Sequence, residues 1–156
     1  MAVKPIPEGY TSVTPYLVIK NAAEALRYYT NAFGAKEILR MDGPNGEVAH
    51  AELQIGTARI MIGEESPDLD WHSPQSIGGS PVTLLLYVQD VDKTFQRAIN
   101  AGAVEIKAVQ DQFYGDRSGV VRDPYGHIWN IATHLEDLTE EEMQTRGRKA
   151  MEGQGG

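Results

Sequence analysis

The sequence predicts an α+β fold built from two tandem copies of one βαβββ unit, a strand followed by a helix and three strands. The first observation behind this prediction is an internal repeat, because residues 14–38 resemble residues 83–106. Thr14 corresponds to Thr83, a shift of 69 positions (83 minus 14). A repeat of this length indicates two supersecondary units that each supply half of a buried surface. The second observation is size, because 156 residues with 41% hydrophobic content are typical of one compact domain.

The elements of the first unit follow from its local patterns. Residues 14–19 are short and β-prone, and Asn21 is expected to cap the helix that follows them. Apolar residues at helical spacing predict that helix over residues 22–33, namely Ala22, Ala25, Leu26, Tyr29 and Phe33. Residues 48–55 alternate between apolar and polar side chains, which predicts a strand with one polar face, and residues 58–62 follow it after a turn.

The second unit repeats this order. Residues 83–88 predict its first strand, and Asp90 is expected to cap a helix over residues 91–101. Asp90 corresponds to Asn21 at the same shift of 69 (90 minus 21). We place the two units at about residues 10–64 and 80–134 of a single domain that spans residues 1–156.

Two segments lie outside the units. Residues 65–79 are rich in Pro, Gly, Ser and acidic residues, which predicts a linker between the units. Thr139 followed by three glutamates predicts the start of a C-terminal helix of about two to three turns. The Gly-rich end of the chain, residues 147–156, is expected to be a flexible tail, so that residues 138–156 comprise a helix and a tail.

Composition excludes several classes of function. The chain has no cysteine, which excludes disulfides, thiolate catalysis and cysteine-ligated metal centres. Its net charge of -8 and its scattered basic residues argue against binding to nucleic acid. No apolar run approaches the ~20 residues that span a bilayer, and no signal-peptide pattern is present. We therefore expect a cytoplasmic protein that binds neither nucleic acid nor membrane.

Two motifs in the second unit carry a family resemblance. They are the run Asp-Gln-Phe-Tyr-Gly-Asp-Arg-Ser-Gly at residues 111–119 and the run Asp-Pro-Tyr-Gly-His-Ile-Trp at residues 123–129. With the paired units, they resemble the vicinal-oxygen-chelate superfamily of glyoxalases, bleomycin-resistance proteins and dioxygenases, and in particular its PhnB-like branch. The resemblance covers residues 10–134. It implies two βαβββ units whose sheets form a curved mixed sheet around a cleft, commonly in a homodimer, while one fold hosts many functions.

The resemblance also implies a metal site, which this chain departs from. Enzymes of the family hold a divalent ion with four side chains, typically His, Gln or Glu, from the first and last strand of each unit. The corresponding residues in this chain are Thr14, Met61, Thr83 and Asn130. None of them is a good ligand for a divalent ion, because methionine prefers soft metals and threonine and asparagine are weak neutral donors. We therefore expect no cofactor at this position, with a divalent metal elsewhere as the alternative.

Alternation along the strands indicates which side chains line the implied cleft. If the four positions above point inward, neighbouring residues of the same parity point inward too, and the repeat places Arg117 with them. The predicted ligand-binding residues are Thr14, Tyr16, His50, Glu52, Arg59, Met61, Thr83, Leu85, Phe113, Arg117 and Asn130. A largely apolar and aromatic lining with a few polar groups is typical of a small-molecule pocket.

Most of the polar candidates have a structural alternative. His50 and Glu52 could be metal ligands or an acid–base pair, or could form a structural hydrogen bond. Arg117 could clamp an anion, or could pair with a nearby acid such as Asp111. Phe113 could stack on a planar ligand or form a core or dimer contact. The remaining histidines are expected to have packing, hydrogen-bonding or loop roles, namely His72, His127 and His134.

Two functional hypotheses follow from the sequence. In the first, the chain binds a small organic ligand, possibly anionic or aromatic, in the cleft without the usual metal. In the second, it is a lyase or isomerase of glyoxalase type that uses His50 and Glu52 as catalytic residues, with a relocated metal or by acid–base chemistry. The ligand chemistry at the four expected metal positions favours the first hypothesis.

Overall fold

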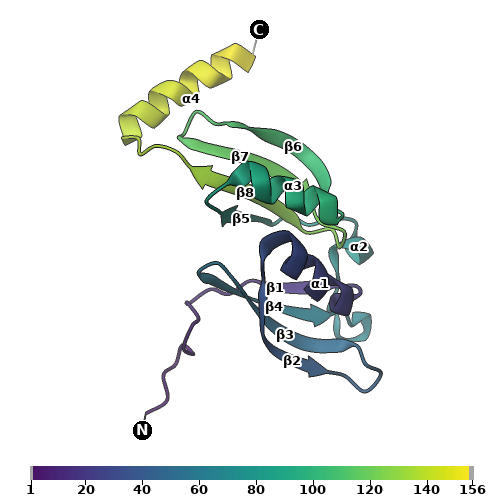
Figure 1. The fold of residues 1–156 in the computed structure, drawn as a ribbon. Helices are drawn as coiled ribbons and strands as arrows, with labels where there is room; N and C mark the ends of the chain where they lie inside the picture. The colour runs from purple at the N-terminus through teal and green to yellow at the C-terminus, as the bar shows by residue number, and fades with distance from the viewer. Residues whose placement is uncertain (1, 155–156) are drawn as a thin grey trace.

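The chain folds as two βαβββ units, as the repeat predicts, in a computed structural model that describes residues 2–154 (Figure 1). The first unit contains β1 (Tyr16–Ile19), α1 (Ala22–Phe33), β2 (Lys36–Asp42), β3 (Val48–Ile55) and β4 (Ala58–Glu64). The second unit contains β5 (Thr83–Tyr87), α3 (Val91–Ala101), β6 (Val104–Asp111), β7 (Asp116–Arg122) and β8 (Ile128–His134). The predicted α+β fold class is confirmed.

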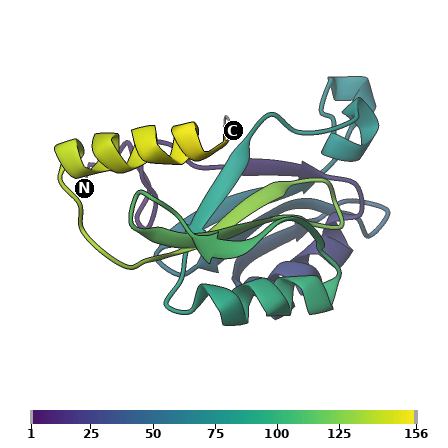
Figure 2. The ribbon, with the colours of Figure 1, turned by 90° about the horizontal axis from the view of Figure 1, so that it is seen from above.

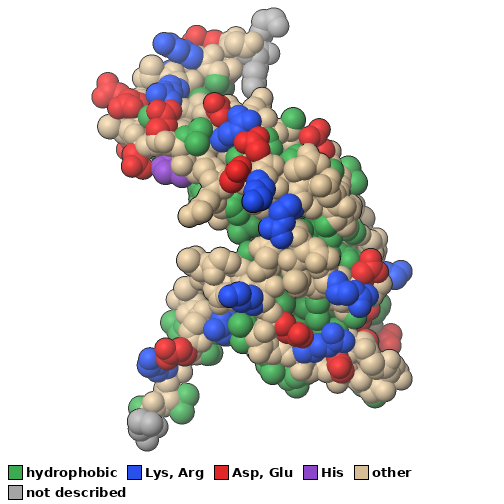
Figure 3. Space-filling view, viewed as in Figure 1, with side chains coloured by type: hydrophobic (Ala, Val, Ile, Leu, Met, Phe, Trp, Pro, Cys, Tyr) green, Lys and Arg blue, Asp and Glu red, His purple; other side chains and the backbone are tan. Residues whose placement is uncertain are grey.

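Each unit forms its own four-stranded sheet. The strand orders are β1-β4-β3-β2 and β5-β8-β7-β6, so the two sheets have the same topology. In each sheet the first strand runs parallel to the last, and the other neighbours are antiparallel. Tyr16 lies opposite Met61 in the first sheet, and Leu85 lies opposite Asn130 in the second. The space-filling view shows an indentation between the two units on one side of the molecule (Figure 3).

The helices α1 and α3 cover one face of each sheet and leave the other face open. The helices α1 and α3 contact each other and lie on the same side of the strands, whereas the C-terminal helix lies on the other side (Figure 2). We call the sheet faces turned away from α1 and α3 the open faces. Burial in β3 follows this division, because Ala51 and Leu53 are buried while His50 and Glu52 are partly exposed. The open faces are therefore where side chains can meet a ligand.

Aromatic side chains of α1 join the two units. Phe33 and Tyr29 pack against Trp129 of β8, with ring centroids 4.7 and 5.6 Å away. Beside them, the buried carboxylate of Asp123 accepts hydrogen bonds from the Tyr29 hydroxyl at 2.5 Å and from the Trp129 indole at 2.9 Å. The core is thus continuous from one unit to the other.

The two main helices begin differently, because only α3 has a local side-chain cap. Asp90 caps α3 as predicted, because its carboxylate accepts from the backbone N–H of Lys93 at 3.2 Å. The prediction that Asn21 caps α1 is wrong. Asn21 adopts a left-handed conformation (φ 72°), and its side chain makes no capping hydrogen bond.

The last strand of each unit supplies a hydrogen-bond acceptor to the helix of the same unit. The Glu64 carboxylate at the end of β4 accepts from the backbone N–H of Ala22 at 2.7 Å. In the second unit the Thr133 hydroxyl of β8 accepts from the N–H of Val91 at 2.9 Å. A carboxylate is favourable beside the partial positive charge of a helix N-terminus, which explains why Glu64 replaces a local cap.

The linker has regular structure and several hydrogen bonds. It contains a 3-10 turn η1 (Pro67–Leu69) and a short helix α2 (Pro74–Ile77). The Glu65 carboxylate accepts from the Ser76 hydroxyl at 2.6 Å and from the Ser73 hydroxyl at 3.1 Å. The hydrogen bond from Ser76 is the main reason that the pKa of Glu65 lies below its usual value. These contacts fix α2 beside the first unit.

The C-terminal helix α4 (Glu140–Gln154) is longer than the sequence predicts. Thr139 caps it as expected, because its hydroxyl accepts from the N–H of Glu142 at 3.1 Å. The helix continues through Gly147, which packs on Phe113, whose ring would lie 3.2 Å from an added Cβ. The expected flexible tail is thus helical as far as Gln154, and residues 155–156 lie outside the described residues. Between residues 2 and 154, no helix is long and apolar enough to cross a membrane.

The buried carboxylate of Asp123 gives a first prediction. Asp123→Ala should lower the free energy of unfolding by roughly 3 kcal/mol, because several buried donors lose a charged acceptor at once. The exposed acid Asp68 provides the matched control, and Asp68→Ala should change the free energy by less than about 0.5 kcal/mol. Urea unfolding followed by tryptophan fluorescence measures both values. Equal effects of the two substitutions would show that the contacts of Asp123 do not join the units.

Candidate functional site

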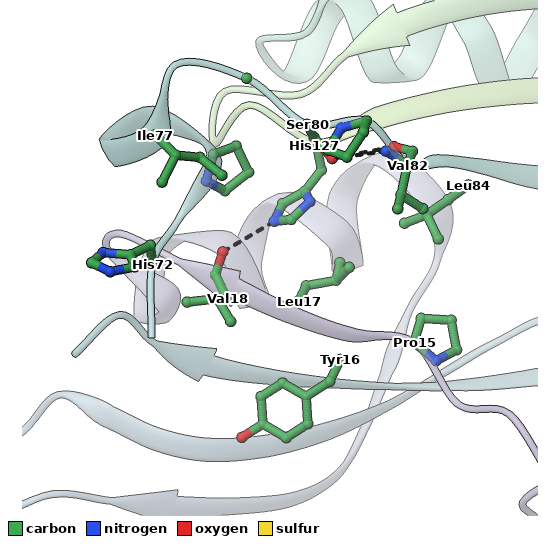
Figure 4. A pocket seen from close by; sticks show the side chains of 13 residues that line it. Pro15, Tyr16, Leu17, Val18, His72, Ile77, Ser80, Val82, Leu84 and His127 are labelled. Carbon is green, nitrogen blue, oxygen red and sulfur yellow. Dashed lines mark hydrogen bonds between the residues drawn. The ribbon is translucent and has the colours of Figure 1, made fainter. Parts of the chain in front are cut away.

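A pocket of about 320 Å³ lies where β1 meets the linker and the start of β5. We call it the junction pocket. Its lining is mainly apolar and includes Pro15, Leu17, Val18, Ile77, Val82 and Leu84 (Figure 4). Two histidines, His72 and His127, add polar edges to it. This size is near the lower end of the range for small-molecule sites, and an apolar lining with few polar groups is typical of them.

His127 forms part of the frame of this pocket. Its Nε2 atom lies 3.1 Å from the carbonyl oxygen of Val18 across the junction (Figure 4). Its backbone N–H donates to the Asp123 carboxylate at 3.0 Å. His127 therefore links the second unit to β1, which agrees with the structural role expected from its sequence position.

A cluster of polar and aromatic side chains lies next to the pocket on the open face of the first sheet. We call Tyr10, Tyr16, His50, Glu52 and Arg59 the Tyr16 cluster. The Tyr16 hydroxyl lies 2.8 Å from Nδ1 of His50, whose Nε2 is 3.8 Å from a Glu52 oxygen. The Tyr10 hydroxyl donates to the other oxygen of Glu52, and the Arg59 guanidinium lies 5.2 Å from the centre of the Tyr10 ring. The five side chains thus form one continuous network.

Tyr16 belongs to both the pocket and the cluster. It lines the junction pocket, and its ring points away from His127 over the neighbouring strands (Figure 4). The ring of Trp71 from the linker meets it edge-on, with the centroids 5.2 Å apart. Tyr16 is therefore the residue that the junction pocket and the Tyr16 cluster have in common.

Burial raises the pKa of both tyrosines of this cluster. Burial, followed by the charge of Glu52, raises the pKa of Tyr16 above its usual value. The pKa of Tyr10 is also raised, first by burial and then by its hydrogen bond to Glu52. A tyrosine is neutral at ordinary pH already at its usual pKa of about 10, so both hydroxyls can donate hydrogen bonds.

The open face of the second sheet combines apolar and polar side chains. Leu85 and Tyr87 are about half exposed there, at 49% and 58%. On β8, Asn130 lies opposite Leu85 on one side and Val120 on the other. In residues 2–154, its Oδ1 atom is the one buried side-chain oxygen or nitrogen without a hydrogen-bond partner. The Tyr87 hydroxyl donates to the buried carboxylate of Asp116 at 2.8 Å.

The structure brings most of the predicted ligand-binding residues onto the two open faces. Tyr16, His50, Glu52, Arg59 and Met61 share the face of the first sheet, as their register shows. Leu85 and Asn130 share the open face of the second sheet. Thr83, which is exposed, lies at the start of β5 on the same face. Thr14 is partly buried and precedes β1 instead of lying within it. Phe113 lies in the turn before β7 against α4, so it is apart from these faces.

The orientation predicted for Arg117 is wrong. Arg117 lies opposite Thr133, which contacts the start of α3, so Arg117 is on the helix-covered side of the second sheet. Its Nε and Nη2 atoms donate to Asp92 at 2.9 Å each, and Nη1 donates to Asp111 at 3.0 Å. The hydrogen bonds from Arg117 lower the pKa of Asp92. Arg117 does not enter the function proposed below.

A single-residue difference between the repeats explains this error. Glu52 lies opposite Met61 in the first sheet, and Val120 lies opposite Asn130 in the second. The last strands thus correspond at a shift of 69 (130 minus 61), whereas the third strands correspond at 68 (120 minus 52). A slip of one residue turns every side chain of a strand to the other face. The alternation within β3 also reverses at its start, where Val48 is buried and Ala49 is exposed.

The residues at the family metal positions do not fit a divalent ion. They offer two hydroxyls, one thioether and one amide, without a carboxylate or an imidazole among them. His50 and Glu52 are close together but provide only two ligands. Throughout residues 2–154, no group of three or more His, Asp or Glu side chains is placed to hold a metal ion. We derive no reaction step through a metal.

Two residues of the site were missed by the sequence analysis. Tyr10 precedes the first predicted strand, and Trp71 lies in the linker, so neither belongs to a periodic segment. An aromatic residue in such a position carries no signal of the face on which it packs. The acceptors on β3 could be predicted from alternation, but the segments that cover them could not.

Comparison with known proteins agrees with the paired units. The sequence profile of the Glyoxalase/Bleomycin resistance protein/Dioxygenase superfamily matches residues 10–131. This chain belongs to that superfamily. An uncharacterized protein of Mycobacterium bovis is 42% identical over 147 residues, which cover 92% of this chain and 94% of that protein.

Solved structures show the same fold. The crystal structure of TioX from Micromonospora sp. matches with a TM-score of 0.63 and 26% identity, covering 83% of this chain and all (100%) of TioX. The PhnB protein from Bacillus cereus matches with a TM-score of 0.62 at 16% identity, covering 79% of this chain and 99% of that one. At this low identity, the second likeness shows the fold alone.

The new position of Arg117 leads to a second prediction. Arg117→Ala should lower the melting temperature slightly, because two exposed acids lose their partner. It should leave unchanged the binding of anilinonaphthalenesulfonate, an aromatic anion that serves as a probe of the junction pocket. Arg148 on α4 is exposed and provides a charge-matched control, Arg148→Ala. Thermal unfolding and titration with anilinonaphthalenesulfonate report the two effects. Loss of dye binding in Arg117→Ala alone would contradict the assignment of Arg117 to the helix-covered side.

His134 provides a third prediction, on pH. Its two ring nitrogens lie 2.7 Å from carboxylate oxygens of Asp116 and Asp137, which raise its pKa, with Asp116 as the larger cause. A raised pKa in the folded state means that the contribution to stability is complete below the unfolded value of about 6.5 and is lost as the pH rises through the higher folded value. The difference in unfolding free energy between wild type and His134→Gln should therefore shrink as the pH rises above about 6.5. A difference that grows with pH in urea titrations would refute this.

Proposed function

We propose that this protein binds a small organic molecule of aromatic character, with its apolar part in the junction pocket and its polar end at the Tyr16 cluster. The observation that carries this proposal is the position of Tyr16, which lines the pocket and also reaches His50 at 2.8 Å. The pocket supplies apolar contact, and the cluster supplies a few hydrogen-bonding groups that orient a ligand. Trp71 adds an aromatic edge beside Tyr16.

We propose further that binding does not use a metal at the family position. The argument is chemical, because the hydroxyl, thioether and amide groups at the four positions are poor ligands for a divalent ion. The Oδ1 atom of Asn130 has no hydrogen-bond partner among the described residues, but it is buried and lies outside the junction pocket. The likeness to the Bacillus cereus protein supports, at the level of the fold, our proposal that the chain belongs to the PhnB-like branch.

A homodimer and a cytoplasmic location are also proposed, as the sequence analysis expects. The open faces carry exposed apolar side chains that a second copy would cover, including Leu39, Met41, Leu85 and Tyr87. Sedimentation that shows a monomer at micromolar concentration would contradict the dimer.

An acid–base enzyme is the second candidate function. It is favoured by the hydrogen bond between Tyr16 and His50 and by the nearness of Glu52, because a positioned imidazole beside a carboxylate can move a proton. The two candidates differ in what happens to the bound molecule. Native mass spectrometry of the protein purified without chelator would identify a co-purified ligand. Incubation of that ligand with the protein in heavy water should place deuterium on carbon, faster than without the protein, if the protein is an acid–base enzyme.

The junction pocket provides a fourth prediction. Ile77→Asp should weaken the binding of anilinonaphthalenesulfonate at least roughly tenfold, because it places a charge that repels the anion on the apolar wall. Ile77 is 63% exposed, so this substitution should leave the fold intact. Leu69→Asp is the matched control, since Leu69 is 79% exposed in the same linker but outside the pocket.

Dye fluorescence measures both affinities, and addition of a chelator should not change them. Equal affinities in the two variants, or an absence of dye binding in the wild type, would contradict the proposed pocket. An affinity that falls on chelation would instead require a metal in the site.

A further inference from the structure

Tyr10 occupies part of the open face of the first sheet in the manner of a ligand. Residues 2–15 contain no helix or strand, yet the Tyr10 ring is half-buried against this face. Its hydroxyl donates to Glu52, and the Arg59 guanidinium lies 5.2 Å from its ring centre. The face therefore holds a phenol between a hydrogen-bond acceptor and a cation, two groups that recognise different parts of the same molecule.

The groups that hold this phenol are fixed by the sheet. The Glu52 side chain is 15% exposed on β3, and Arg59 donates from Nε to the side-chain oxygen of Gln54 at 2.7 Å. Gly9 lets the chain approach Arg59 closely, because a Cβ there would lie 2.7 Å from its Nη2 atom, and its φ of +85° favours glycine. Glu52 and Arg59 are thus arranged around an aromatic ring before any ligand arrives.

The attachment of the N-terminal segment is easily exchanged. Within residues 2–154, the bond from Tyr10 to Glu52 is the one hydrogen bond that joins residues 2–13 to the rest of the chain. The backbone of this segment joins no strand of the sheet. A free molecule that makes the same two contacts can therefore replace Tyr10 without breaking secondary structure.

We infer that Glu52 and Arg59 form a binding subsite for a neutral hydroxylated aromatic ring, which Tyr10 fills in the free protein and which the ligand takes by displacing Tyr10. This inference rests on the proposed function and specifies one end of its ligand. The Glu52 carboxylate accepts from a hydroxyl and repels a carboxylate or a phenolate, so it selects a protonated phenol. The Arg59 cation favours an electron-rich ring beneath it. The expectation of a possibly anionic ligand is thereby narrowed, at this subsite, to a neutral phenol.

The test uses p-cresol as the probe and toluene, which lacks the hydroxyl, as its control. Removal of the internal competitor in Tyr10→Ala should strengthen the binding of p-cresol at least roughly tenfold relative to wild type, measured by calorimetry. In that variant p-cresol should bind about fivefold or more tightly than toluene, because only p-cresol donates to Glu52. Adding Glu52→Leu to Tyr10→Ala should remove this preference.

Two further measurements keep the test independent of how well Tyr10→Ala folds. Tyr10→Phe retains the ring but cannot donate to Glu52, and should bind p-cresol with intermediate affinity. In the wild type, saturating p-cresol should increase amide hydrogen exchange in residues 9–13 as the segment is released. Tyr114→Ala removes a partly buried tyrosine in the other unit and should leave p-cresol binding unchanged.

The inference is overturned if Tyr10→Ala binds p-cresol no better than the wild type does, or no better than it binds toluene. It is also overturned if the wild type binds p-cresol while exchange in residues 9–13 stays the same. These outcomes are separate from the proposed function, which depends on dye binding and on Ile77. If Ile77→Asp loses dye binding but Tyr10→Ala does not change p-cresol binding, the pocket is supported and only the phenol subsite is refuted.

Discussion

The buried carboxylate of Asp123 is the interaction on which the arrangement of the two units depends. It accepts from the Tyr29 hydroxyl of the first unit and from the Trp129 indole of the second. It also accepts from the backbone N–H groups of Tyr125 and His127, so it sets the shape of the turn before β8. A buried charge is tolerated when several hydrogen bonds satisfy it, and here those bonds come from both units.

The candidate site follows from this turn. With its backbone held by Asp123, His127 reaches the carbonyl of Val18 and so fixes β1 relative to β8. Tyr16 also lies on β1, where it lines the pocket and contacts His50 of the polar cluster. The position of the binding groups is therefore determined by a carboxylate that does not line the pocket itself.

Sequence patterns predicted the fold well because the signals were long and were present twice. The repeat, the helical spacing in residues 22–33 and the alternation in residues 48–55 all report burial, which dominates the choice of element. They also placed His50 and Glu52 on one face, as the register shows. The side-chain orientation predicted for Arg117 was wrong, because a difference of one residue between the repeats turns the side chains of its strand to the other face.

Other features could not be read from local sequence. The acceptor that replaces a cap by Asn21 is Glu64, which lies 42 positions away from the N–H of Ala22. Tyr10 contributes through a segment without periodicity, and Gly147 within α4 packs on Phe113. Each of these is a tertiary contact, and such contacts routinely override local preference.

The two open faces share a backbone frame but differ in chemistry. The first carries Tyr16, His50, Glu52 and Arg59, whereas the second combines Leu85 and Tyr87 with Asn130 and the buried Asp116. The corresponding last-strand residues are Met61 and Asn130. A duplicated unit thus provides two surfaces of the same shape, and different side chains on each define what it can bind.

The acceptors that the last strands give to the helices have a consequence for how each unit folds. The hydrogen bonds that the N–H of Ala22 donates to Glu64 and the N–H of Val91 donates to Thr133 both span 42 positions, most of a unit. The first N–H group of each helix, that of Ala22 or Val91, is therefore satisfied only after the final strand has been added to the sheet. Contacts of such long sequence separation slow the search for the native state. Each βαβββ unit should accordingly form as a whole, because neither its helix nor its sheet is complete while the other is missing.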